Sequence, residues 1–219
     1  SEYLPGKSLN IGVREATGKY IVCLSGHCIP VNNQWLEFLV NTIEESNHYA
    51  GVYGRQESMS FSSDSDKRDL LLAFGLDKRV QIKDSFFHNA NSIIRKEFLD
   101  EVPFDDNITN IEDRIWAQEM ILRGRNIVYE PKASVYHYHG IHQDGDRERC
   151  TNIVKIIESF SENPISGGSI DPKKIRINAL IPIKGKPVYF DDVPQLKYTI
   201  DSALESTYVD QVFVIADDI

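Results

Sequence analysis

The sequence predicts an α/β fold: a mixed sheet flanked by helices, followed by the start of a second α/β unit. Residues 20–24 (Tyr-Ile-Val-Cys-Leu) form a continuous apolar run, typical of a strand covered on both faces. Residues 109–124 have the spacing of a helix, and a short apolar strand pattern follows at 126–130. A new strand–helix–strand pattern starts near residue 175 and indicates the second unit.

Composition indicates an ordinary globular chain and excludes some classes. The 219 residues are 41% hydrophobic and 26% charged, enough for one large domain or two small ones. The net charge of −9 argues against binding to a nucleic-acid backbone. No run approaches the roughly 18 apolar residues of a transmembrane helix. The three cysteines show no metal-ligand spacing, which favours a reduced, cytoplasmic setting.

The elements of the first domain follow from local patterns. The expected strands are 19–24, 50–56, 84–94 and 126–130, the last stopped by Pro131. The expected helices are 8–17, 34–46, 69–75, 96–101 and one that begins near Thr109. A polar, serine-rich loop is expected at 58–66.

The helix near Thr109 is the centre of the prediction. Thr109 and Glu112 stand at capping-box spacing, and Gly124 suits the C′ position. The apolar positions expected to face the core are Ile111, Ile115, Trp116, Met120 and Leu122.

The same helix carries an acidic pair, Glu112 and Asp113, on its first turn. One interpretation is a solvated helix start, because carboxylates favour the positive end of the helix dipole. The other is that Glu112 caps the helix while Asp113, which has no capping duty, faces a cleft.

A second polar cluster follows the strand at 19–24. Ser25, Gly26, His27 and Cys28 come directly after it, and α/β sheets bind their ligands at the carboxyl ends of such strands. We therefore expect a ligand site there.

The predicted organisation is a domain at 1–160, a linker at 161–173 and the start of a second domain at 174–219. The linker is rich in Ser, Gly and Pro. The second unit, with strands at 175–183 and 211–216 around a helix at 194–206, is too small to bury a core alone. Both ends look cut, so we expect a fragment of a longer protein.

Several motifs of residues 1–145, in order, resemble family 2 glycosyltransferases of the GT-A fold. They are Ser8-x-Asn10-x-Gly12, Ala16-x-Gly18-x-Tyr20-Ile21, Trp35-Leu36, Asn89-Ala90-Asn91, Glu112-Asp113-x-x-Trp116-Ala117 and Tyr136-His137. The closest branch builds bacterial surface polysaccharides. The resemblance implies an inverting sugar transfer with Asp113 as catalytic base and Glu112 beside it. It also implies that the unit holding the nucleotide base would precede Ser1.

The sequence departs from the family at the metal site. The usual Asp-x-Asp is replaced by Ser25-Gly26-His27, so the Mn²⁺ or Mg²⁺ that the resemblance implies has His27 at its position. His27 binds the metal, hydrogen-bonds a phosphate or fills space; the sequence leaves these three alternatives open.

The histidines at 137, 139 and 142 are a further candidate ligand group. His137 and His139 would share one face of a strand, and the resemblance carries the family's metal or diphosphate contact to His137, with His139 second. The alternative is a surface loop of titrating histidines. A structural zinc site is not expected, because no cysteine is close in sequence.

The resemblance also implies residues that contact the donor or the acceptor. They are Ser25, His27, Asn89, Asn91, Arg114 and Trp116. Arg55 and Arg95 are weaker phosphate candidates, because a lone arginine is more often a surface or ion-pair residue.

The tail resembles the start of cytidylyltransferases that activate sialic-acid-type sugars. The matching segments are Asn178 to Pro182, Tyr198 to Leu204 and Val212 to Asp218. The family's glycine-rich phosphate loop is replaced by residues 183–187, in which Lys184 and Lys186 are the candidate nucleotide-binding side chains.

The sequence thus predicts a glycosyltransferase that moves a sugar from a nucleotide sugar to a glycan or lipid-linked acceptor. We expect a cytoplasmic protein with peripheral association at the inner membrane face. The alternatives are a non-catalytic nucleotide- or glycan-binding module and a bifunctional glycosyltransferase–cytidylyltransferase fragment.

Overall fold

The computed structural model describes residues 4–137, 147–160, 177–183, 188–206 and 209–216. The chain separates into two compact units, Ser1–Glu162 and Asn163–Ile219. The predicted linker, 161–173, lies outside the described residues. None of the helices in the described ranges is long and apolar enough to cross a membrane.

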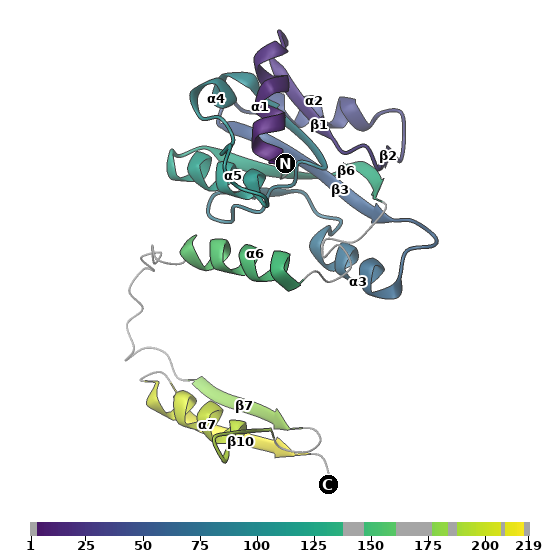
Figure 1. Ribbon diagram of the computed structural model, residues 1–219. Helices are drawn as coiled ribbons and strands as arrows, with labels where there is room; N and C mark the ends of the chain where they lie inside the picture. The colour runs from purple at the N-terminus through teal and green to yellow at the C-terminus, as the bar shows by residue number, and fades with distance from the viewer. Residues whose placement is uncertain (1–3, 138–146, 161–176, 184–187, 207–208, 217–219) are drawn as a thin grey trace. The chain divides into compact units, whose positions relative to one another are not determined.

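The first unit is built on a mixed sheet with the strand order β1-β5-β3-β6-β2 (Figure 1). β3 and β6 are parallel, and the other neighbours in this order are antiparallel. β4 pairs with the first part of β6, on the same side as β2. The strands are β1 (Tyr20–Leu24), β2 (Cys28–Pro30), β3 (Tyr49–Ser58), β4 (Arg79–Gln81), β5 (Asn91–Arg95) and β6 (Asn126–His137). The mixed sheet is confirmed; β2 and β4 were not predicted.

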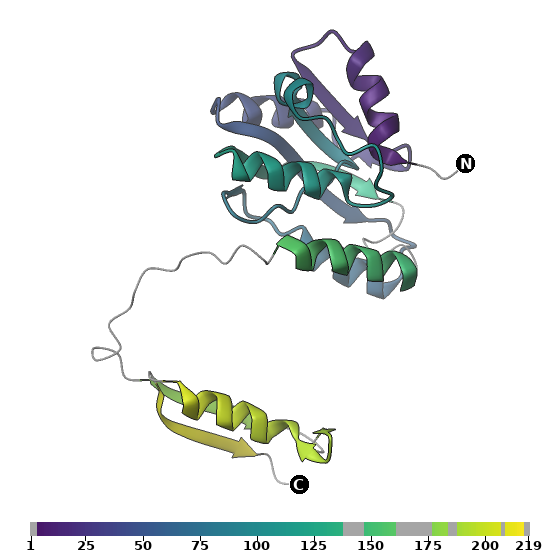
Figure 2. The ribbon, with the colours of Figure 1, turned by 60° about the vertical axis from the view of Figure 1, so that its left-hand side comes forward.

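Helices cover both faces of this sheet (Figures 1 and 2). α2 packs on one face, where Leu39 and Ile43 join Val52, Ile93 and Val128 in a buried cluster. The opposite face holds a larger cluster with side chains from α1, α3, α4 and α5. The helices of this unit are α1 (Pro5–Glu15), α2 (Trp35–Glu44), α3 (Asp64–Ala73), α4 (Lys96–Glu101), α5 (Glu112–Leu122) and α6 (Arg147–Phe160).

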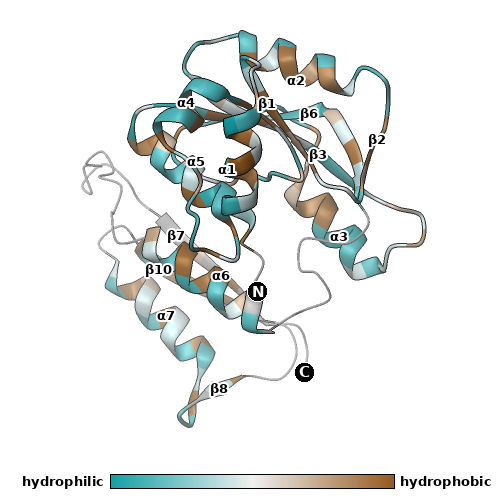
Figure 3. Cartoon of the chain, turned by 45° about the horizontal axis from the view of Figure 1, so that its top comes forward, coloured by the Kyte–Doolittle hydropathy of each residue, from teal (hydrophilic) through white to brown (hydrophobic). Residues whose placement is uncertain are grey.

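Two helices begin earlier than the sequence patterns suggested. α1 begins at Pro5, because the fixed φ of proline suits the first helical position. α3 begins at Asp64, within the predicted loop, and the Ser63 hydroxyl caps it by accepting a 3.1 Å bond from the N–H of Asp66. α3 then changes from hydrophilic to hydrophobic along its length (Figure 3).

The start of α5 corrects the capping-box prediction. The helix begins at Glu112, and its N-cap residue is Ile111, which makes no side-chain capping bond. The Thr109 hydroxyl instead accepts a 3.0 Å bond from the Asn110 amide. Ile111 has φ 53° and ψ 31°, a left-handed conformation that is strained for a β-branched residue. The surrounding packing therefore holds the chain in a turn that the local sequence disfavours.

The buried face of α5 also differs from the prediction. Leu122 is exposed and Ile111 and Ile115 are only partly buried. The buried face consists of Glu112, Asp113, Trp116, Ala117 and Met120. The acidic pair therefore lies on the helix face that carries the core side chains.

The end of α5 is as predicted. Gly124 has φ 76°, and its N–H donates to the carbonyl of Ile121. The N–H of Arg125 donates to the carbonyl of Met120. These two bonds form a Schellman motif, which requires a left-handed residue at the C′ position.

β6 continues through Pro131, which was predicted to stop it. The register between β3 and β6 shifts near this proline, between Gly54 and Gln56. A bulge accommodates proline because one ladder hydrogen bond is missing there. The shift needs a glycine: a Cβ on Gly54 would lie 1.9 Å from the carbonyl oxygen of Ala133 and 2.3 Å from the amide nitrogen of Asn91.

Most of the predicted strand at 84–94 is irregular; only Asn91–Arg95 forms β5. The buried amide of Gln81 donates to the carbonyls of Asp84 and Phe86, both at 2.8 Å. The carbonyls of Asp84 and Phe86 are thus hydrogen-bonded to a side chain rather than to a neighbouring strand.

The second unit is a strand–helix–strand arrangement. β7 (Ile177–Ile183) pairs in parallel with β10 (Val209–Ala216), and α7 (Gln195–Glu205) lies between them in sequence. A small antiparallel pair, β8 (Tyr189–Phe190) and β9 (Val193–Pro194), precedes α7. The element order matches the pattern expected from the sequence.

Candidate functional site

Three strands that run in the same direction end at one edge of the first unit's sheet. β1 ends at Leu24, β3 at Ser58 and β6 at His137, and Ser58 is in register with His137. The antiparallel β5 begins at this edge, where Asn91 faces Leu24. Ligands of open α/β sheets bind at the carboxyl ends of parallel strands. This edge is therefore the candidate ligand site of the first unit.

Asp113 is held by two main-chain N–H groups. Its Oδ2 accepts a 2.9 Å bond from Asn89, in the loop before β5, and its Oδ1 accepts a 2.8 Å bond from Arg114. The carboxylate is buried on the first turn of α5, where the helix dipole favours negative charge. The bond from Asn89 attaches Asp113 to the loop at the sheet edge.

Burial raises the pKa of Asp113 above its ordinary value of 3.8. The bonds from Asn89 and Arg114 and the positive charge of Arg114 act in the opposite direction but do not cancel the effect of burial. A desolvated carboxylate with a raised pKa is a stronger base than one in water. The first interpretation of the acidic pair, a solvated helix start, is therefore wrong for Asp113.

Glu112 is also buried on the first turn of α5. Its Oε1 lies 3.5 Å from the side-chain amide of Asn89, which donates to it. Asn89 thus contacts both acids, Asp113 with its backbone and Glu112 with its side chain. The capping role of Glu112 stays a prediction.

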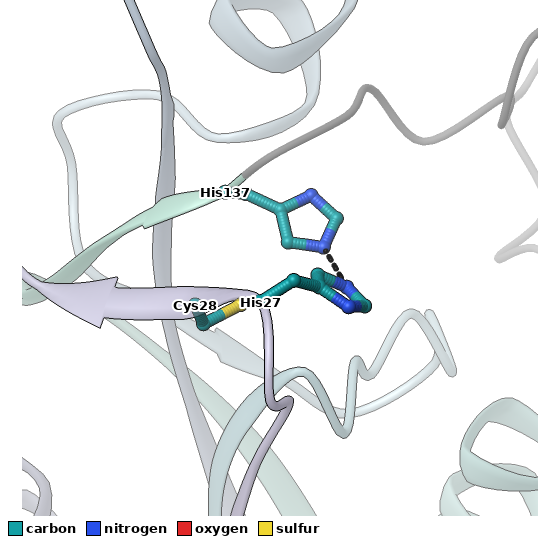
Figure 4. A group of neighbouring side chains, drawn as sticks. All are labelled: His27, Cys28 and His137. Carbon is teal, nitrogen blue, oxygen red and sulfur yellow. Dashed lines mark hydrogen bonds between the residues drawn. The ribbon is translucent and has the colours of Figure 1, made fainter.

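Two histidines and a cysteine meet at the same edge (Figure 4). The Nε2 atoms of His27 and His137 are 3.1 Å apart, and their ring centroids are separated by 4.9 Å. Cys28 pairs with His137 across β2 and β6, and the ligand atoms of all three side chains lie within 4.8 Å of one another. We call these three residues the His–Cys cluster.

His88 extends the cluster and was not identified from the sequence. Its ring centroid is 6.3 Å from that of His137, and its Nδ1 accepts a 3.2 Å bond from the N–H of Ala90. A neutral His88 therefore carries its proton on Nε2. Its position one residue before Asn89 was the available signal.

The His–Cys cluster does not fit the predicted Mg²⁺ and fits Mn²⁺ poorly. It offers two imidazole nitrogens and one sulfur, whereas these two ions prefer oxygen ligands. Within the described residues, no other group of three His, Cys, Asp or Glu side chains is close enough to hold an ion. Cys28 also corrects the argument against a cysteine-containing site: it is distant from His137 in sequence but adjacent in the sheet.

Ser25 and the two asparagines shape the edge in different ways. The N–H of Ser25 donates to Ala90 and its carbonyl accepts from Cys28, which fixes the turn before β2. Asn91 is fully buried; its amide donates to the carbonyls of Arg55 and Ala133 and accepts from the Trp35 indole. Asn91 therefore joins strands, and its contact with a ligand stays a prediction.

Trp116 and Arg114, two further predicted ligand contacts, differ in their surroundings. Trp116 is buried against Phe87 and Phe104, and its indole N–H donates to the carbonyl of Val102. These contacts give it a place in the core, and its contact with substrate stays a prediction. Arg114 is partly buried, with its guanidinium 4.3 Å from the ring centre of Phe86. Burial lowers the pKa of Arg114, and the charge of Asp113 opposes that shift. Its predicted role in binding stays a prediction.

The two other arginines have protein partners. Arg95 is buried and donates to the carbonyls of Ile43, Ser46 and Tyr49, near the end of α2. Arg55 lies 3.6 Å from Glu57. Arg95 therefore has a structural role and is unsuited to phosphate binding.

Three predicted site residues lie outside the described residues. They are His139, Lys184 and Lys186.

Comparisons with known proteins agree with this fold. Residues 3–103 match the family model described as glycosyl transferase family 2. A search of curated proteins found no match.

Similar solved structures include that of GalNAc-T7 with UDP, GalNAc and Mn²⁺, at 16% identity and a TM-score of 0.50, covering 70% of this chain and 34% of that one. TarS 1-349 of S. aureus has 13% identity and a TM-score of 0.50, with coverages of 74% and 46%. The chain thus spans less than half the length of either structure, and identities this low establish the fold alone. Residues 3–103 carry the sequence pattern of family 2 glycosyltransferases, and the unit that contains them has the mixed α/β fold of GT-A glycosyltransferases.

Proposed function

We propose that this protein transfers a sugar from a nucleotide-sugar donor to a hydroxyl of a glycan or lipid-linked acceptor, with inversion at the anomeric carbon. Asp113 is the proposed base. Its carboxylate takes the proton of the acceptor hydroxyl while the hydroxyl oxygen attacks the anomeric carbon. The bond from that carbon to the phosphate oxygen breaks, and the nucleoside diphosphate leaves with the electron pair.

The observation that carries this proposal is the environment of Asp113. Two main-chain N–H groups orient the carboxylate, and its burial raises the pKa. General bases work best when they are both positioned and partly desolvated. Asn89, which is bonded to both acids, is the proposed contact on the acceptor side.

The histidines support a place for the diphosphate at the same edge. His27 is exposed on the turn after β1, and its ring lies beside that of His137, which in turn lies near His88. Imidazole N–H groups donate hydrogen bonds to phosphate oxygens. We therefore propose that the leaving diphosphate faces His27. The transfer as proposed here includes no step that relies on Mg²⁺ or Mn²⁺.

The setting that we propose is the synthesis of bacterial surface polysaccharide, at the inner face of the membrane. The motif resemblance of residues 1–145 supports it. GalNAc-T7 was solved with UDP and GalNAc, which supports testing UDP-sugars first.

The test is a sugar-transfer assay of the full-length protein that contains residues 1–219. Its substrates are UDP-, GDP- and CMP-sugars and an oligosaccharide acceptor. Product mass and the anomeric configuration of the product, read by NMR, report on transfer and inversion. We expect Asp113→Asn to lower kcat by about 100-fold or more while donor binding persists. Asp100→Asn is the matched control, because Asp100 is exposed and pairs with Lys96.

Two results would contradict the proposal. If no donor is turned over but a nucleotide or glycan still binds, the protein is a binding module. If Asp113→Asn transfers sugar at the rate of Asp100→Asn, then Asp113 is not the base.

For the second unit we propose a separate cytidine-nucleotide site. Its support is the parallel pairing of β7 and β10, because the segment after a parallel strand commonly binds phosphate. Lys184 and Lys186 follow β7 directly in the sequence. Titration of CTP by calorimetry, with Lys184→Ala and Lys186→Ala, tests it; equal CTP affinity in all three proteins contradicts it.

A further inference from the structure

The His–Cys cluster contains Cys28, a residue that neither the family resemblance nor the proposed sugar transfer explains. His27 and Cys28 come from the turn and strand after β1, whereas His137 is the last residue of β6. The antiparallel register places Cys28 directly opposite His137. Side chains of directly opposed residues point to the same face of a sheet, so both face the same space. His27 brings its ring to that space from the adjacent turn (Figure 4).

The distances suit one tetrahedral ion. With Zn–N bonds of about 2.0–2.1 Å and a Zn–S bond of about 2.3 Å, a tetrahedral site needs roughly 3.3 Å between two nitrogens and roughly 3.6 Å between nitrogen and sulfur. The two Nε2 atoms are 3.1 Å apart, close to the first value. Each sulfur–nitrogen separation is at most 4.8 Å.

The donor types then select the metal. Sulfur and imidazole nitrogen favour Zn²⁺, Co²⁺ and related late transition metals, whereas Mg²⁺ and Mn²⁺ favour carboxylate, carbonyl and water oxygens. Within the described residues no carboxylate belongs to this cluster. We propose that His27, Cys28 and His137 form a three-ligand site for Zn²⁺ or a similar late transition metal, in place of a Mn²⁺ or Mg²⁺ site.

Three protein ligands leave a fourth tetrahedral position for another ligand. His27 is exposed, while Cys28 and His137 are buried, so this site opens toward solvent on the side of His27. Water or an anionic oxygen, such as that of a phosphate group, would take the fourth position. The proposed metal site does not depend on whether the protein transfers sugar.

Cobalt titration tests this site directly. The chain is purified metal-free with a reductant that lacks thiols, and Co²⁺ is added while the absorbance is recorded. We expect one equivalent to give visible bands of tetrahedral Co²⁺ and a near-ultraviolet band from thiolate to Co²⁺. We expect Zn²⁺ to displace the Co²⁺, and a large excess of Mn²⁺ or Mg²⁺ to leave the spectrum unchanged.

Variants assign the ligands. We expect Cys28→Ser to abolish the near-ultraviolet band and to weaken Zn²⁺ binding by more than about 100-fold. His27→Ala should weaken it similarly; because His27 is exposed, this variant should keep its fold. Cys23→Ser and Cys150→Ser are matched controls, because neither cysteine belongs to the cluster. Circular dichroism of each variant checks folding.

Several results of these titrations would overturn the proposed metal site. An absence of Zn²⁺ binding by the folded wild-type chain overturns the proposal. So does binding that His27→Ala retains, a thiolate band that Cys28→Ser retains, or displacement of Co²⁺ by Mn²⁺ at equal concentration. None of these readouts depends on sugar transfer, so failure of the transferase proposal leaves this test intact.

Discussion

The main-chain N–H of Asn89 donates a 2.9 Å hydrogen bond to the Oδ2 atom of Asp113, across 24 residues of sequence. This bond joins the loop before β5 to the first turn of α5. It directs one carboxylate oxygen to the backbone at the sheet edge where β1, β3 and β6 end. The orientation of the proposed base therefore depends on the path of a loop as well as on its own helix.

The ionisation of Asp113 predicts opposite effects of Asp113→Asn on activity and stability. Because burial raises the pKa in the folded state, the charged form costs stability, and the full cost is present above that raised pKa. The cost disappears as the pH falls through the folded pKa toward the ordinary 3.8, where the carboxyl is neutral in both states. We expect Asp113→Asn to be inactive yet more stable than wild type at pH 7.

Urea unfolding at a series of pH values measures this difference. The stability advantage of Asp113→Asn should shrink as the pH is lowered and vanish below about 3.8. The acidic limb of the kcat/KM profile of the wild type should lie above the same value. Asp100→Asn serves as the control, and a variant advantage that grows as the pH falls would contradict the assignment.

The bulge between β3 and β6 predicts a severe defect for Gly54→Ala. The added Cβ would overlap the carbonyl of Ala133 and the amide of Asn91, and both belong to the sheet. We expect a loss of more than about 3 kcal/mol in the free energy of unfolding. Gly12→Ala is the matched control, since nothing lies within 4 Å of its Cβ position in α1. It should gain about 0.5–1 kcal/mol, and equal stabilities of the two variants would disprove the close approach.

Replacing Arg95 with lysine should destabilise the fold although both side chains are positively charged. Its guanidinium donates to three main-chain carbonyls, those of Ile43, Ser46 and Tyr49, and a lysine cannot reproduce that planar geometry. We expect Arg95→Lys to lower the free energy of unfolding by about 2–4 kcal/mol. Thermal unfolding measures the change, with Arg123→Lys on the exposed end of α5 as the comparison. If the two substitutions had the same small effect, the capping role of Arg95 would be excluded.

Cys23 and Cys150 should be alkylated at different rates in the folded protein. Burial raises the pKa of Cys23 to about 12, so at pH 8 roughly one molecule in 10⁴ carries the reactive thiolate. Cys150 on α6 is partly exposed. Brief treatment with iodoacetamide followed by peptide mass spectrometry should label Cys150 well before Cys23. In urea the two should react alike, and rapid labelling of Cys23 in the native protein would show that β1 opens readily.

Much of the fold followed from local patterns. The apolar run of β1, the amphipathic spacing of α2 and the C′ glycine of α5 each encode an element through side chains a few residues apart. Such patterns are sufficient because strand alternation, helix periodicity and left-handed caps are properties of short segments. They were insufficient at Pro131, where β6 bulges against β3 and continues, and at Thr109, where Ile111 took the N-cap position.

The sequence identified several residues of the candidate site but was less informative about the role of each residue. Asp113, His27 and His137 were identified by type and order, and the structure places the two histidines in contact. Asn91 and Trp116 were also candidates and Arg95 was a weaker one, yet polar atoms of all three bond to the protein itself. Burial and hydrogen-bond partners distinguish these groups, and both depend on residues tens of positions away.

By itself, the sequence determined the class of fold and an acid on the first turn of a helix, because these follow from short-range spacing and residue type. Only the tertiary structure decided that Asp113 is buried and that Cys28 stands opposite His137. The physical reason is the register of a sheet: it pairs residues more than 100 positions apart, and no local propensity specifies that pairing.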